Sequence, residues 1–247
     1  MRKGFGWIPD QPDEKDVYLK LSKPKDFTRV YDIRWSGYMP PVRDQGNVGS
    51  CTGYGVATGA WSGMLSDKTF TMPAFHPSEL FIYYNGRKDK SHDTGASIRD
   101  VVKGTINYGV SPLSAWLNKP GNVLKRPTDD AYRQALKFKT IRYARIRQKR
   151  EDICNVLASG YPVIFGHLCY TNFFSVKKDG IVPMPKGRIE GGHCEVICGY
   201  NLDKGWLLVQ NSWGTSRGDR GYEYFPFEYI MDKELCMDLW TIYKVSI

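Results

Sequence analysis

Two residues that suit nucleophilic catalysis, Gln45 and Cys51, flank one glycine-rich turn. Cys51 opens an apolar stretch directly after this turn, and Gln45 precedes it by six positions. The thiolate is the reactive form of cysteine, and a helix N-terminus or a nearby imidazolium can lower a thiol pKa from ~8.5 by several units. The amide of Gln45 and the backbone N–H of Cys51 could together stabilise an oxyanion. A lone cysteine is more often buried and inert, so this chemistry requires a base elsewhere in the chain.

The second half of the chain supplies a base and a group that could orient it. His193 follows two glycines, and Asn211 opens the sequence Asn-Ser-Trp-Gly. Their separations from Cys51 are 193 − 51 = 142 and 211 − 51 = 160 positions. With these motifs the chain resembles the papain-like cysteine peptidases, particularly their bacterial and archaeal branch, for which such a Cys–His spacing is a known signature. The resemblance runs from about Val30 to Val245.

The resemblance implies an α+β fold in which a helical left lobe and a β-barrel right lobe meet at an active-site cleft. Carried over by motif, Cys51 is the nucleophile, His193 the general acid/base, and Asn211 the residue that orients the imidazole. Gln45 is then an oxyanion donor, and Trp213 shields the Asn211–His193 hydrogen bond. The substrate is a polypeptide, a protein inhibitor is a possible partner, and no cofactor is expected.

The resemblance also implies contacts for an extended substrate. Gly49 and Gly192 leave room for its backbone, and the Gly95–Ala96 segment pairs with it as an edge strand does. Cys194 is expected to wall the pocket beside the nucleophile. The pattern departs from the family at Thr52, which replaces an aromatic residue, and at Glu195. Because alternate strand positions share a face, the Glu195 carboxylate is expected near His193 or against a buried cation.

The order of the predicted elements is helical first and β-rich afterwards, which indicates an α+β class. We predict an extended arm over residues 1–29 and a peptidase domain over 30–247, with a helical lobe at about 40–136 and a β-rich lobe at about 137–245. Helices are expected at 51–66 and 77–88, after a cap at Thr94 or Ser97, and around 131–136. Strands are expected from Ile141, and at 162–168, 192–200 and 206–211.

The helix predicted at 51–66 contains four glycines, each costing about 0.5–1 kcal/mol relative to alanine. Three of them, Gly55, Gly59 and Gly63, recur every four residues and give one smooth face. This face predicts close packing against a sheet or another backbone. A helix that is held by burial rather than by propensity, and that carries the candidate nucleophile, is typical of a functional site.

Composition indicates a globular protein without a membrane span. The 247 residues are 41% hydrophobic and 14% aromatic, and no apolar run approaches the ~18 residues that a span needs. The N-terminus lacks the apolar core of a signal peptide. The six cysteines are interpreted as mostly reduced, which favours an intracellular location, and their spacing with His193 does not suit a metal site. The oligomeric state is left open.

The net charge of +9 is concentrated between Lys137 and Arg150, where seven basic residues occur without an acid. The apolar residues between them favour a strand with a bulge near Tyr143 and a solvated basic face. Binding of a nucleic acid or another polyanion is the less favoured interpretation.

The arm contains one apolar segment, Phe5-Gly6-Trp7-Ile8-Pro9-Asp10. Trp7 and Ile8 either pack on the back of a lobe or lie in the cleft and temper activity, because a cleft for extended peptides can accept this segment. For the whole chain, a peptidase is the favoured function. A related Cys–His amidase or acyltransferase and a non-catalytic binding scaffold are the alternatives.

Overall fold

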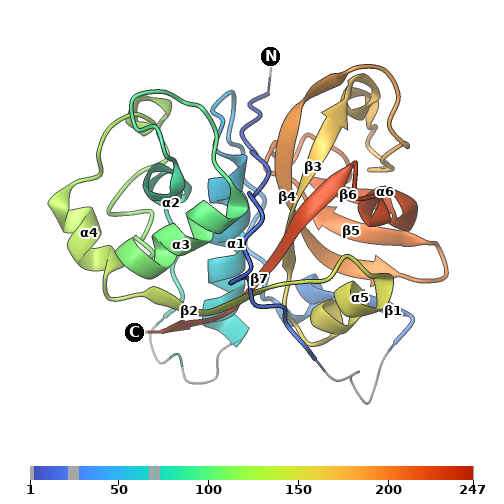
Figure 1. Cartoon of the computed structure of the whole chain (residues 1–247), viewed down its shortest axis with the longest axis horizontal. Helices are drawn as coiled ribbons and strands as arrows, with labels where there is room; N and C mark the ends of the chain where they lie inside the picture. Colours follow the sequence, from blue (N-terminus) through green and yellow to red (C-terminus); the bar gives the residue numbers. More distant parts are fainter. Residues whose placement is uncertain (1–2, 22–27, 67–69, 71–72, 247) are drawn as a thin grey trace.

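The computed structural model describes residues 3–21, 28–66, 70 and 73–246. Figure 1 shows most of the helices on one side and most of the sheet on the other, with the N-terminal segment running between them. The helical side holds four helices: α1 (Cys51–Ser66), α2 (Glu79–Gly86), α3 (Ile98–Tyr108) and α4 (Asp129–Ala135). Two further helices lie against the sheet: α5 (Arg150–Ala158) and α6 (Phe227–Met231). This arrangement confirms the α+β class.

The sheet is antiparallel, with the hydrogen-bonded order β2-β7-β3-β4-β5-β6 and with β1 added to β4. Its strands are β1 (Val30–Asp32), β2 (Lys139–Arg145), β3 (Val163–Tyr170), β4 (Ile189–Asn201), β5 (Trp206–Gln210), β6 (Tyr222–Pro226) and β7 (Cys236–Ser246). The expectation of a β-barrel is wrong. In the described sheet β2 and β6 are at the two ends of the strand order and do not pair with each other, so the sheet is not closed. Strands β2 and β7 extend to the helical side, where they pack on α3 and α1 respectively.

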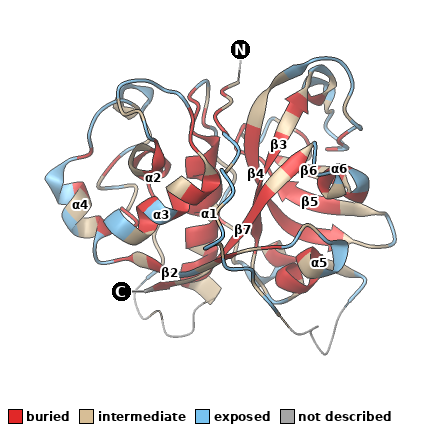
Figure 2. Ribbon diagram, in the orientation of Figure 1, coloured by how far each residue is buried: buried red, intermediate tan, exposed pale blue. Residues whose placement is uncertain are grey.

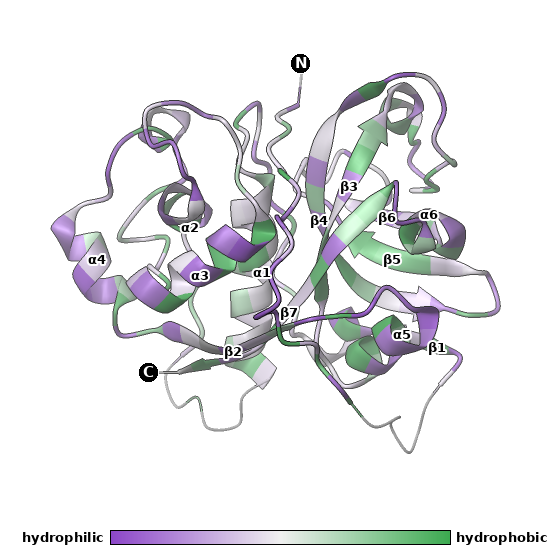
Figure 3. Cartoon of the chain, in the orientation of Figure 1, coloured by the Kyte–Doolittle hydropathy of each residue, from purple (hydrophilic) through white to green (hydrophobic). Residues whose placement is uncertain are grey.

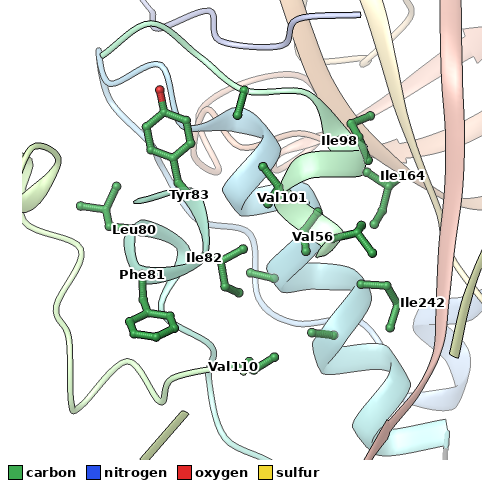
Figure 4. Close-up of a cluster of buried hydrophobic side chains, with 14 of the residues drawn as sticks. Val56, Leu80, Phe81, Ile82, Tyr83, Ile98, Val101, Val110, Ile164 and Ile242 are labelled. Carbon is green, nitrogen blue, oxygen red and sulfur yellow. The ribbon is translucent and has the colours of Figure 1, made fainter. Parts of the chain in front are cut away.

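Helix α1 is the element at which the helical side and the sheet meet. A Cβ atom at Gly55 would lie 2.8 Å from Cys194 Sγ, and one at Gly59 would lie 2.9 Å from Ile164 Cδ1. The face predicted from the glycine spacing therefore does pack against the sheet. Figure 4 shows the core on the helical side, where Val56 of α1 lies among side chains from α2, α3 and the strands. Figure 2 shows that α1 is buried over most of its length.

The other predicted elements agree with the structure in type more often than in bounds. Ser97 caps α3 by accepting a hydrogen bond from the Asp100 N–H, as one of the two predicted caps. Ser78 caps α2, so this helix begins later than Pro77. The pairing of β2 with β7 shifts register on both sides of Arg142, at the predicted bulge. Helices α5 and α6 were not predicted.

The basic residues between Lys137 and Arg150 are mostly exposed. Figure 3 shows that α5, which begins at Arg150, carries both hydrophilic and hydrophobic residues. Arg145 is the exception, because it forms ion pairs with Asp10, Asp16 and Asp238 at 2.7–2.9 Å. No helix among the described residues is long and apolar enough to cross a membrane.

Candidate active site

Cys51 is the first residue of α1 and is fully buried. The helix axis therefore begins at the candidate nucleophile, and its unpaired N–H groups and positive dipole end favour an anion there. A Cβ atom at Gly53 would lie 2.6 Å from the Glu79 carbonyl oxygen, so this glycine lets α2 approach the first turn of α1. The close packing on both sides of α1 fixes where the Cys51 thiol lies.

His193 lies on β4 and is fully buried. Its Nε2 atom is 3.1 Å from Oδ1 of Asn211, and its ring is stacked on Trp213 with ring centroids 4.6 Å apart. The other ring nitrogen, Nδ1, has no hydrogen-bond partner among the described residues. Although burial favours a neutral ring, Cys51 and Glu195 raise the pKa of His193 to about 10. The imidazolium is therefore the stable form at neutral pH.

Asn211 is held by two hydrogen bonds that the sequence analysis did not predict. Its Nδ2 donates to Glu223 Oε2 at 3.1 Å, and Glu223 in turn forms an ion pair with Arg217. The Ser212 N–H also donates to Asn211 Oδ1 at 2.6 Å. Burial and the charge of Glu195 raise the pKa of Glu223, whereas the contacts with Arg217 and Asn211 oppose this shift. These contacts fix the amide with its oxygen toward His193, the orientation that an imidazolium requires.

Gln45 is buried beside the same site. Its Nε2 donates to the carbonyl oxygens of Val48, at 2.8 Å, and of Gly4, at 3.1 Å. Its Oε1 accepts a hydrogen bond from Ser212 Oγ, and its backbone N–H donates to the Ser212 carbonyl at 2.9 Å. Ser212 therefore links Gln45 to the Asn211 segment. An amide N–H that already binds a carbonyl oxygen is a suitable donor for an oxyanion.

One wall of the site is set by a hydrogen-bonded chain that the sequence analysis missed. Asp93 accepts from the Gly49 N–H at 2.8 Å and from the Tyr83 hydroxyl at 2.5 Å. The Tyr83 oxygen then accepts from the Gly95 N–H at 2.9 Å. Gly95 has φ = +83°, a conformation that glycine adopts without strain. This chain joins two predicted substrate-binding positions, and no local motif signals it because its members come from separate segments.

The N-terminal arm lies between this wall and β4 (Figure 1). The Gly6 and Trp7 N–H groups both lie 3.1 Å from the Gly192 carbonyl oxygen, and the Ala96 N–H donates to the Gly6 carbonyl at 2.8 Å. The Ile8 N–H returns a hydrogen bond of 3.1 Å to Ala96. Five of the predicted substrate-binding residues are thus in contact with the arm: Gly49, Gly95, Ala96, Gly192 and Trp213.

Side chains of the arm fill the space around these hydrogen bonds. The Phe5 ring packs edge-on against His193 and Trp213, with centroids 6.2 and 5.9 Å apart. Trp7 is only 4% exposed, and a Cβ atom at Gly166 would lie 1.9 Å from its indole ring. Trp7 therefore packs in the interior between the two sides of the molecule and not on the back of a lobe.

The remaining predicted residues lie on β4 behind His193. Cys194 is 1% exposed and its thiol packs against Gly55 of α1. Glu195 is fully buried, with Oε1 at 3.4 Å from His193 Nε2 and Oε2 at 3.5 Å from His167 Nε2. Its position beside His193 agrees with the strand alternation. All six cysteines are buried, and none of them forms a disulfide in the structure. Among the described residues, no group of three or more His, Cys, Asp or Glu could hold a metal ion.

Comparisons with known proteins give the same picture. Residues 84–236 match a family model described as papain family cysteine protease. The chain is 34% identical to the uncharacterized peptidase C1-like protein L477 of Acanthamoeba polyphaga mimivirus, over 99% of this chain and 88% of that protein. It is 26% identical to cathepsin K of Gallus gallus, over 77% of this chain and 56% of that protein.

A solved structure is similar over nearly the whole chain. The crystal structure of Xylellain, a cysteine protease from Xylella fastidiosa, is 32% identical in sequence and superimposes with a TM-score of 0.88. The match covers 98% of this chain and 96% of that chain, so it includes the arm and both halves of the fold.

Proposed function

The chain belongs to the papain family of cysteine proteases, and from this premise we propose that it hydrolyses peptide bonds with Cys51 as nucleophile and His193 as general acid/base. Asn211 orients the imidazolium, and Gln45 and the Cys51 N–H stabilise the oxyanion. The observation that carries this proposal is the His193 ring, stacked on Trp213 and directed by Asn211, at the junction with the first turn of α1.

The mechanism follows from the charges of these groups. The Cys51 thiolate attacks the scissile carbonyl carbon, and the carbonyl oxygen becomes an oxyanion. His193, as an imidazolium, protonates the leaving amine, and a thioester to Cys51 remains. The neutral imidazole then takes a proton from water, which attacks the thioester and releases the acid. Asn211 keeps Nε2 occupied throughout, so the proton transfers occur at Nδ1.

Turnover of a peptide library by the wild-type chain and by Cys51→Ala tests this function. The substitution removes one sulfur atom from a site whose shape is set by backbone packing, so the variant should fold but cleave no peptide. His193→Ala should be nearly as inactive, and the double variant hardly worse, because nucleophile and base act as a unit. More than a trace of cleavage by folded Cys51→Ala would refute the assignment of the nucleophile.

We further propose that the arm occludes the site in this conformation. Cys51 and His193 are both fully buried, the Gly4 carbonyl uses the side-chain donor of Gln45, and Phe5 covers the imidazole ring. A polypeptide substrate needs the Gly192 and Ala96 backbone groups that Gly6 and Trp7 now use. Cleavage therefore requires residues 3–8 to leave the cleft, and the arm acts as a tethered competitor.

A further inference from the structure

Glu195 carries a buried charge for which the proposed mechanism has no role. The carboxylate lies on the same face of β4 as His193 and has no solvent exposure. Neither of its oxygens has a hydrogen bond of normal geometry within the described part of the chain. The Nε2 atoms of His193 and His167 lie 3.4 and 3.5 Å from them. A carboxylate buried in this way is costly unless a positive charge faces it.

Geometry indicates that His193 rather than His167 supplies this positive charge. His167 lies directly opposite His193 on β3, and its Nδ1 is 3.4 Å from the Tyr229 hydroxyl. Tyr229 gives its only proton to the Leu168 carbonyl at 2.8 Å, so Nδ1 of His167 is the donor in that contact. Nε2 of a neutral His167 then presents a lone pair to Glu195. Burial lowers the pKa of His167, which favours this neutral ring.

The other titratable groups around Glu195 do not replace this partner. Burial raises the pKa values of the thiols of Cys169, Cys194 and Cys236 well above the usual range, so these groups are neutral. Arg217 is paired with Glu223, and Glu223 also holds Asn211. Although burial favours the protonated acid, the contact with the His193 imidazolium lowers the pKa of Glu195. The titratable and polar groups around Glu195 are, in full, Cys51, His167, Cys169, His193, Cys194, Asn211, Arg217, Glu223, Tyr229 and Cys236.

We propose that Glu195 is a positioning residue whose negative charge stabilises the His193 imidazolium independently of the Cys51 thiolate. The Asn211 amide is neutral and fixes only the direction of the ring, whereas the carboxylate of Glu195 adds a charge in a site that water does not screen. The site thus combines an amide and a carboxylate behind one imidazole. The role proposed for Glu195 deepens the proposed function, but the protonation of His193 can be measured without turnover.

The sharpest test removes the thiolate and asks whether His193 stays charged. In Cys51→Ala, the ¹⁵N chemical shifts of the His193 ring should show an imidazolium at pH 7. In Cys51→Ala combined with Glu195→Gln, which keeps the shape and removes the charge, the titration midpoint should fall by at least ~1 pH unit. Glu195→Asp should retain most of the charge effect, and Glu228→Gln, which changes an exposed carboxylate on α6, should have none.

Equal His193 midpoints in Cys51→Ala with and without Glu195→Gln would overturn the proposal. If the double variant does not fold, Cys51→Ala alone decides, because a neutral His193 at pH 7 in that variant contradicts the proposal. In the active chain, Glu195→Gln should move the alkaline limb of the kcat/KM profile to lower pH, because the His193 imidazolium then loses its proton at lower pH. An equal loss of kcat/KM at every pH, with unmoved limbs, would show a structural role only. Loss of peptidase activity in the wild type would refute the proposed function but leave the ring titration intact.

Discussion

Gln45 and Asn211 assist the reaction through side-chain amides that are fixed by different neighbours. Because Gln45 is an oxyanion donor in our account, Gln45→Ala should lower kcat by ~10²–10³ and change KM much less. Asn211→Ala should be milder, because Trp213 still stacks on the imidazole. At saturating substrate the arm is displaced, so kcat reports the chemistry. If Gln45→Ala weakens binding of a non-hydrolysable substrate analogue as much as it lowers kcat, Gln45 is a ground-state contact.

The types and spacing of the four candidate catalytic residues could be found from the sequence, since the motifs around them are local. The residues that support them could not. Glu223 and Arg217 meet Asn211 only because β6 and the loop before it pack beside β5, and Asp93 meets Gly49 across 44 positions. Strand alternation placed Glu195 near His193, but no local pattern predicts the contact of Glu195 with His167, because it depends on the register of β3 and β4.

The helix that carries Cys51 was predicted with its observed bounds, because an apolar stretch after a glycine-rich turn and a four-residue glycine repeat are both visible in the sequence. Helix α5 was missed, since the basic stretch before it continues a strand pattern. The β-barrel was wrong because the pairing of β2 with β7, and the packing of both on the helical side, are long-range choices that no local pattern specifies.

The two faces of α1 respond differently to an added methyl group. A Cβ atom at Gly53 would lie 2.6 Å from a backbone oxygen of α2, so Gly53→Ala should destabilise the fold by ~1–3 kcal/mol. At Gly63 the nearest atoms are at 3.4 Å, an ordinary contact, so Gly63→Ala should stabilise the helix by ~0.5–1 kcal/mol. Urea unfolding of both variants measures this difference. Equal changes in the free energy of unfolding of the two variants would contradict the described packing of α1.

On the scale of the whole molecule, the arm is joined to both sides of the cleft. Beyond the cleft, Asp10 accepts from the Arg99 N–H, on α3, and from Arg145, on β2. Arg99 and Arg145 also pair with Asp16. Residues 3–8 can therefore be displaced while Asp10 and Asp16 keep the following segment anchored.

Gly6→Ala tests the occlusion without truncating the chain. A Cβ atom at Gly6 would lie 1.7 Å from the Gly49 carbonyl oxygen, so the arm cannot keep its place in the cleft. We expect kcat/KM toward small peptides, and the rate of Cys51 alkylation, to rise by ~10-fold or more. Gly121→Ala is the matched control, because no atom of the described residues lies within 4 Å of a Cβ atom there. Unchanged rates with a lower melting temperature would show that the arm is only a structural strap.

The family, the fold and the contacts of the arm together describe a peptidase in which one buried thiol among six is the nucleophile. The most direct measurement is to treat the full chain with a thiol-directed epoxide, map the adduct by peptide mass spectrometry, and follow cleavage of a peptide library during the reaction. Our account predicts a single adduct on Cys51 and a loss of cleavage in proportion to labelling. An adduct on another cysteine that abolishes cleavage, or full cleavage by a chain completely labelled at Cys51, would contradict it.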